Sequence, residues 1–63
     1  MEEFVASVLN EIRNGANYQD NIARALNASS SDTEKALLVL ASRGKIYLGS
    51  KDILGNYKDI APR

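Results

Sequence analysis

The chain has 63 residues with a formal net charge of zero, eight basic against eight acidic, and it contains neither His nor Cys. One domain with one small core is the most that this length allows, and such a chain buries only about 60 % of the surface that it would expose unfolded. The missing residue types exclude disulfides and thiolate metal sites, and they remove the commonest general base and zinc ligand, so we expect no metal and no cofactor.

No segment of the chain is predicted to enter a membrane. The longest uninterrupted apolar stretch covers residues 36–41, whereas a helix that crosses a bilayer needs about 20 residues. The chain opens with Glu2 and Glu3 rather than with a basic stretch and an apolar core, so its start is unlike a secretory signal. We therefore expect a cytoplasmic protein.

Charge is distributed unevenly along the chain. Residues 1–34 carry six acidic and two basic residues, a formal charge of −4, whereas residues 35–63 carry six basic and two acidic residues, a formal charge of +4. An acidic first half and a basic second half indicate an oriented contact with an anionic partner.

The first predicted helix covers residues 2–14. Its apolar residues recur at spacings of one, three and four, which places them on one stripe of a helix: Phe4, Val5, Val8, Leu9 and Ile12. Glu2 and Glu3 suit the positive end of the helix dipole, and Gly15 is a natural C-terminal stop.

The second predicted helix covers residues 18–27. One face carries Tyr18 and three apolar residues: Ile22, Ala23 and Leu26. Asn17 is predicted to cap the start of this helix with its side chain. Asp20 and Arg24 are four residues apart, so they are placed to form an ion pair on the helix surface.

The third predicted helix covers residues 32–43. Ser31 and Glu34 have the spacing of a capping box, in which the hydroxyl and the carboxylate each bond a backbone N–H at the helix start. The inward face is formed by three residues: Ala36, Leu37 and Leu40. Leu38 is therefore predicted to point outward, and Gly44 to end the helix.

Residues 45–60 predict a β-hairpin. Residues 45–48 alternate polar and apolar side chains as a strand does, two glycines bracket the turn region, and residues 56–60 return. Tyr57 and Ile60 are three residues apart, so they cannot both face the core from a regular strand. A bulge or an earlier turn would reconcile them.

These elements predict an α+β fold that is mostly helical, with three helices and a C-terminal hairpin in a single domain of residues 1–63. Pro62 is predicted to end the domain. We expect no enzyme, because the chain lacks a phosphate-cradling glycine loop and a serine beside an obvious base.

Three pieces of the sequence carry a family resemblance. Residues 22–29 (IARALNAS) give an I-A-x-x-L helix followed by a short polar turn, Leu37 and Leu40 give an L-x-x-L ending, and residues 43–46 (RGKI) give a glycine followed by a hydrophobic strand. In this order they resemble the winged-helix family of helix-turn-helix proteins, over nearly the whole chain. The resemblance implies a hairpin wing and binding to double-stranded DNA.

The resemblance also implies which residues contact DNA. In a helix-turn-helix the N-terminal half of the second motif helix enters the major groove, and the wing lies near the backbone or minor groove. The implied contacts are Ser30, Ser31, Thr33, Lys35, Arg43, Lys45, Lys51 and Lys58. Taken singly, Arg43, Lys45 and Lys58 are each better explained as an ordinary solvated surface charge. The expected protein is a small transcriptional regulator, binding as a homodimer that reads two half-sites.

Three residues of the third helix argue against DNA. Asp32 and Glu34 place carboxylates where phosphates would lie, although Glu34 is better explained as serving the helix N-terminus. An outward Leu38 either touches a thymine methyl or marks a protein contact. The alternative function is therefore a winged-helix interaction module that docks a protein partner through Leu38, Ile53 or Leu54.

Overall fold

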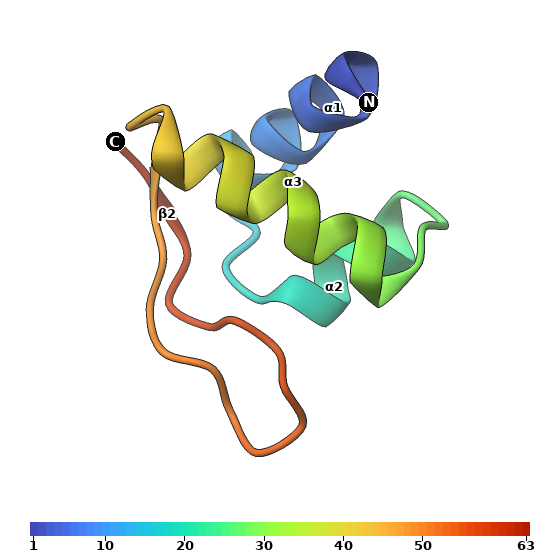
Figure 1. The fold of residues 1–63 in the computed structure, drawn as a ribbon, viewed down its shortest axis with the longest axis vertical. Coiled ribbons are helices and arrows are strands. Elements are labelled where there is room, and N and C mark those ends of the chain that lie inside the picture. The colour runs from blue at the N-terminus through green and yellow to red at the C-terminus, as the bar shows by residue number, and fades with distance from the viewer.

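A computed structural model gives the fold of residues 1–63 (Figure 1). Three helices, α1 (Glu2–Arg13), α2 (Gln19–Ala25) and α3 (Ser30–Ser42), precede two strands, β1 (Ile46–Tyr47) and β2 (Ala61–Pro62). The strands form one antiparallel sheet, with Ile46 opposite Pro62 and Tyr47 opposite Ala61. The predicted α+β layout of three helices and a hairpin is confirmed.

Helices α1 and α2 differ from their predicted bounds by one or two residues at each end that moved. Helix α1 ends at Arg13, and Gly15 beyond it has a φ of 110°, the left-handed conformation expected at a helix stop. Helix α2 is shorter than predicted, and its N-cap is Tyr18 without a side-chain bond. Asn17 was predicted to be that cap, which is wrong. Its carbonyl oxygen instead accepts a hydrogen bond from the N–H of Ile60 at 3.1 Å.

Helix α3 begins two residues earlier than predicted. Ser29 is its N-cap, and the Oγ of Ser29 accepts a hydrogen bond from the N–H of Asp32 at 3.0 Å. The predicted capping box of Ser31 and Glu34 is therefore wrong, because a second serine at the right spacing from an acidic residue lies upstream of it. Gly44 follows the helix with a φ of 71° and turns the chain toward β1.

The hairpin has a regular ladder only at its base. Beyond β1 the arms are joined by the hydrogen bonds from the N–H of Gly49 to the carbonyl oxygen of Lys58 and from the N–H of Lys58 to that of Ser50, and by a bridge between Lys51 and Tyr57. Asp59 has a φ of 54°, which breaks the returning strand and lets Ile60 be buried while Tyr57 packs against the same core. This kink is the irregularity that the spacing of Tyr57 and Ile60 required. Gly49 lies opposite, where a Cβ would be 2.3 Å from the carbonyl oxygen of Lys58.

The core lies between the three helices and the base of the hairpin. Its apolar cluster draws on every helix and on both arms of the hairpin: Val5, Val8, Ile12, Ile22, Ala36, Leu37, Leu40, Ile46 and Ile60. Two polar residues, Gln19 and Thr33, are also fully buried, and no buried side-chain nitrogen or oxygen lacks a hydrogen-bond partner.

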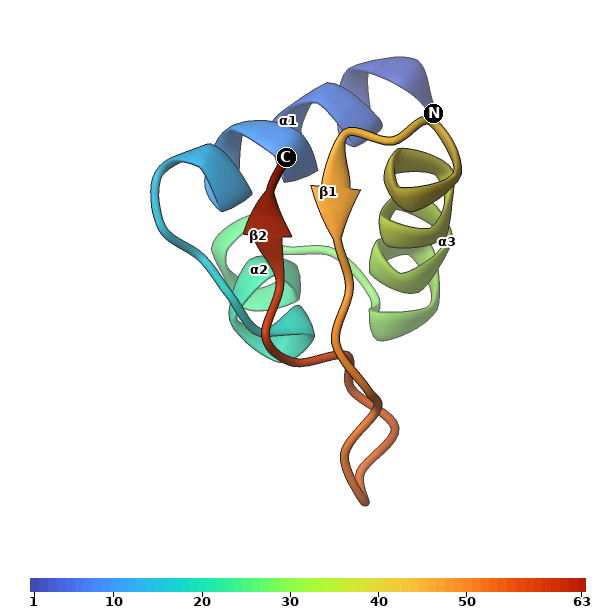
Figure 2. The same ribbon diagram turned by 90° about the vertical axis from the view of Figure 1, so that its left-hand side faces the viewer.

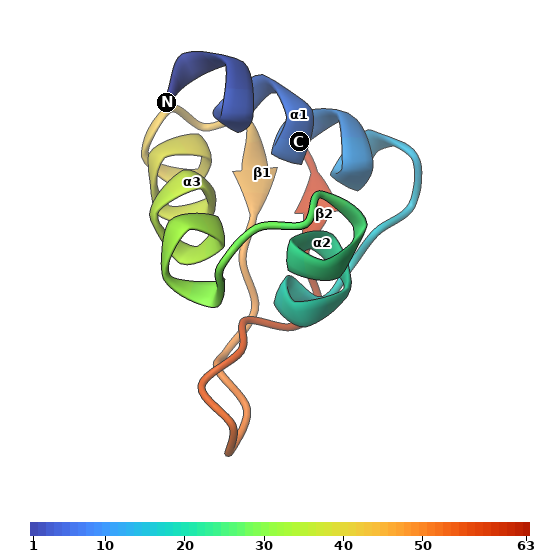
Figure 3. The ribbon, with the colours of Figure 1, turned by 90° about the vertical axis from the view of Figure 1, so that its right-hand side faces the viewer.

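The arrangement of the elements places the hairpin beside the start of α3. The hairpin leaves the body of the protein and extends past the end of the molecule at which α3 begins (Figures 1 and 2). From the side opposite to that of Figure 2, the connection between α2 and α3 lies toward the viewer, in front of the two strands (Figure 3). None of the three helices has the length and apolar character needed to cross a membrane.

Candidate nucleic-acid interface

One face of α3 is not covered by any other element. Ser31, Lys35, Leu38 and Ser42 follow one another at spacings of four, three and four residues, and all four are exposed. We call them the outer face of α3. The prediction that Leu38 points outward is confirmed, because 45 % of its surface is accessible. A bare helix face with hydroxyl, cationic and methyl groups has the chemical features that a major groove can accept.

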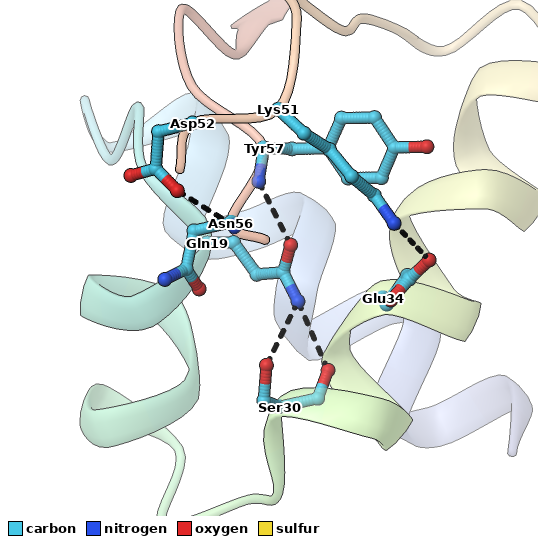
Figure 4. Close-up of polar contacts among 7 residues, drawn as sticks. All are labelled: Gln19, Ser30, Glu34, Lys51, Asp52, Asn56 and Tyr57. Atoms are coloured by element: carbon cyan, nitrogen blue, oxygen red, sulfur yellow. Dashed lines mark hydrogen bonds and ion pairs between the residues drawn. The ribbon is translucent and has the colours of Figure 1, made fainter. Parts of the chain in front are cut away.

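A buried amide joins this helix to the hairpin (Figure 4). The Nε2 of Gln19 donates to the carbonyl oxygen of Ser30 at 3.0 Å and to its Oγ at 3.1 Å. The Oε1 of Gln19 accepts from the N–H of Tyr57 at 2.9 Å, and its backbone N–H donates to the carbonyl oxygen of Tyr57 at 3.0 Å. One side chain of α2 therefore fixes the start of α3 against the returning arm of the hairpin.

Sequence reasoning missed Gln19. Gln19 is not one of the residues of the predicted apolar face of this helix, and glutamine is mostly exposed in folded proteins. The only sequence signal was its place at the helix start, where a polar residue is ordinary.

The turn of the hairpin is held by Asp52. Its Oδ1 accepts hydrogen bonds from the N–H of Leu54 at 3.0 Å and of Asn56 at 2.9 Å, and its Oδ2 accepts from the hydroxyl of Tyr18. The hydrogen bond from Tyr18 holds the pKa of Asp52 below its ordinary value, and the same bond raises the pKa of Tyr18. The Tyr18 hydroxyl is thus engaged within the protein.

Lys51 links the hairpin to α3 by charge. Its Nζ lies 2.9 Å from Oε2 of Glu34 and 5.1 Å from the ring centroid of Tyr57 (Figure 4). The hydrogen bond to Glu34 raises the pKa of Lys51 above its ordinary value. Glu34 was interpreted as serving the helix N-terminus; its carboxylate instead pairs with the hairpin. Both side chains remain partly accessible, so an external anion can reach this pair.

The predicted DNA contacts fall into two groups. Ser30, Ser31 and Lys35 lie in the N-terminal half of α3, and Lys51 and Lys58 lie on the two arms of the hairpin beside it. All five are exposed, and Lys51 contacts α3 through Glu34.

Arg43 and Lys45 lie at the other end of α3. Arg43 donates to both carboxylate oxygens of Glu2, at 2.9 and 2.8 Å. This bidentate bond lowers the pKa of Glu2 and raises that of Arg43. Lys45 is exposed and forms no ion pair. Neither residue shares a surface with the beginning of α3, so we do not include them in the candidate interface.

Thr33 was predicted to contact DNA, and the structure contradicts this. Its side chain is fully buried, and its Oγ1 donates to the carbonyl oxygen of Ser29 at 2.9 Å. The cause is the helical period, because Thr33 precedes Ala36 and Leu37 by three and four residues and so shares their inward face. Thr33 therefore supports the helix start and offers nothing to a ligand.

The residues named for a protein contact are exposed. Ile53 is completely accessible and Leu54 is 78 % accessible, both at the turn of the hairpin. A pocket of about 150 Å³ lies elsewhere, between α1 and the end of α3. Ligand pockets are commonly several hundred Å³, so this one suits no more than a small group.

Comparisons of the chain with protein-family models, with curated proteins and with solved structures gave no match.

Proposed function

We propose that the protein is a cytoplasmic DNA-binding protein of the winged-helix type, a small transcriptional regulator that reads duplex DNA with the outer face of α3 and with the hairpin. The observation that carries the proposal is the bare outer face of α3, held beside a projecting hairpin by Gln19 and by the pair of Lys51 with Glu34. A helix of 13 residues is about 20 Å long, and the major groove is about 12 Å wide and accepts a helix.

Each side chain of the interface has a role that suits its chemistry. The hydroxyls of Ser30 and Ser31 lie in the first turn of α3, where a helix start is favourable for phosphate. Lys35 lies one turn further along and can reach a phosphate or a guanine edge. Leu38 then faces the groove, where a thymine methyl is an apolar partner.

The hairpin would add phosphate contacts. Lys58 is exposed and forms no ion pair, so its charge is available to the backbone. Lys51 has Glu34 as a partner, and binding would exchange that carboxylate for a phosphate. Because the net charge of the chain is zero, we propose that two copies bind together, which doubles the basic surface and allows two half-sites to be read.

Fluorescence anisotropy with labelled random-sequence duplex at low and moderate salt tests the proposal. We expect binding that weakens steeply as salt rises, and a slope of log K against log salt that becomes shallower by about 1 for each bound copy in Lys35→Ala and in Lys51→Ala. Arg13→Ala is the matched control, because it removes one exposed cation from α1. Equal losses in all three variants, or no binding by the wild type at low salt, would refute the proposal.

The exposed apolar residues support a second candidate, a module that binds a protein partner. Leu38, Ile53 and Leu54 are all accessible, and exposed apolar surface can mark a site of contact with another protein. Leu38→Asp separates the two candidates. If it removes a captured partner while the wild type shows no DNA binding, the second candidate is correct.

A further inference from the structure

The turn of the hairpin presents two aliphatic side chains to water. Ile53 and Leu54 are adjacent in sequence, and they are the most exposed large apolar residues of the chain. Nothing else in the fold touches Ile53, since its whole surface is accessible. We call these two residues the apolar tip. An aliphatic pair that contributes nothing to the core of a small domain needs another explanation.

The backbone that carries the apolar tip is fixed. The N–H of Asp52 donates to the carbonyl oxygen of Asn56 at 2.8 Å, and the N–H of Gly55 donates to that of Asp52 at 3.0 Å. Both oxygens of the Asp52 carboxylate are occupied, one by backbone N–H groups and one by the Tyr18 hydroxyl. Gly55 has a φ of 85°, a conformation that glycine adopts without strain. The tip is thus preorganised, which lowers the entropy lost when it inserts into a partner.

The tip lies where a second groove would be. It projects beyond the end of the molecule at which α3 begins (Figures 1 and 2), and Lys51 and Lys58 flank it on the two arms of the hairpin. A duplex that holds the first turns of α3 in its major groove would therefore present an adjoining minor groove to the tip. Lysines on either side would bind the phosphates that border that groove.

The size of the tip favours a base step over a protein surface. A stable protein interface removes about 800 Å² from each partner, whereas the whole accessible surface of this protein is 3870 Å². Two side chains on a narrow turn supply a small part of such an area. One or two aliphatic side chains are, by contrast, the size of the wedges that enter the minor groove and unstack a base step.

We propose that Ile53 and Leu54 form a wedge that inserts into the minor groove and bends the bound DNA. The inference rests on the proposed function, because the tip reaches a groove only when α3 is docked on a duplex. The wedge gives the hairpin an activity beyond phosphate contact, since unstacking one step bends the duplex by roughly 20–90° toward the major groove. Pyrimidine–purine steps unstack most easily, so the wedge favours sites that place such a step under the hairpin.

The test uses the full chain and a duplex with a central TA step, labelled at its ends for energy transfer and carrying 2-aminopurine at that step. We expect wild-type protein to raise both the energy transfer and the 2-aminopurine fluorescence. The double variant Ile53→Ser, Leu54→Ser should still bind in anisotropy, with affinity lower by about tenfold or less, and should leave both signals at the level of free DNA. The matched control Ile53→Val, Leu54→Met keeps aliphatic volume and should retain both signals. Circular dichroism checks that each variant is folded.

Three results would overturn the wedge. If wild-type protein binds the duplex without changing the energy transfer or the 2-aminopurine fluorescence, the wedge is refuted and the proposed function stands. The same holds if the serine variant bends DNA as much as the wild type does. A mass in solution, measured by sedimentation without DNA, that falls in the serine variant would make the tip a contact between copies. Absence of any wild-type binding in anisotropy would instead remove the proposed function itself.

Discussion

Replacing Gln19 by leucine should remove a large part of the stability of the domain, because the amide is fully buried and satisfies groups on two other elements. Leucine has a similar volume, so the change removes three side-chain hydrogen bonds with little change in packing. Each such bond contributes about 1 kcal/mol, and a buried donor left without a partner costs about 1–3 kcal/mol. The N–H of Tyr57 is that donor. Ser30 is exposed, so water replaces its partner at little cost.

The expected loss in Gln19→Leu is therefore about 2–4 kcal/mol, against about 5–15 kcal/mol for a whole domain. Urea unfolding followed by circular dichroism measures this difference at constant m-value. Asn21→Leu is the control, because it also removes an amide from α2, but an exposed one that bonds only Arg24; its effect should stay below about 0.5 kcal/mol. Equal stabilities of the two variants would refute the assignment of Gln19 as the clamp between α2, α3 and the hairpin.

The other predictions concern single contacts of the hairpin. Glu34→Gln should raise affinity for duplex DNA in anisotropy, because Lys51 no longer has a carboxylate partner to exchange; an unchanged or lower affinity would contradict that exchange. Gly49→Ala should destabilise the fold by about 1–3 kcal/mol in urea unfolding, because its Cβ would lie 2.3 Å from the carbonyl oxygen of Lys58; a neutral effect would show that the two arms separate freely. The pKa of Asp52 is held below its ordinary value of 3.8. Its carboxylate therefore stabilises the fold above that pH, and this contribution is lost as the pH falls through the lower pKa of the folded state. In Asp52→Asn the free energy of unfolding should accordingly fall less steeply as the pH is lowered.

The sequence predicted the helices well, because the apolar spacing of an amphipathic helix is set by the core that it must cover. The apolar stripe of residues 4–12 and the inward face of Ala36, Leu37 and Leu40 have the periods found in the structure. The start of α3 could not be chosen from local pattern alone. Two serines stand three residues before an acidic residue, Ser29 before Asp32 and Ser31 before Glu34, and packing of Thr33 into the core selects the first.

The candidate site was less predictable because its geometry depends on contacts between residues far apart in the chain. Lys51 and Glu34 are 17 residues apart, and Gln19 and Tyr57 are 38 apart. No periodicity connects such pairs, and each residue alone is an ordinary surface type. Thr33 is a different case, because local spacing does place it. It stands three and four residues before Ala36 and Leu37, so helical periodicity puts it on their inward face, where the structure has it.

Under the proposed function, the ion pairs limit how strongly a single copy binds DNA. Three of the eight cations, Arg24, Arg43 and Lys51, are paired with carboxylates. At the candidate interface this leaves Lys35 and Lys58 available, with Lys51 added only after it leaves Glu34. Three phosphate contacts give a slope of roughly −2.7 in log K against log salt, so a fourfold rise in salt should weaken binding by roughly 40-fold. Two copies bound together would give about twice that slope. A measured slope near −5 therefore favours a dimer on DNA, and a slope near zero would refute the assignment of all three lysines to phosphates.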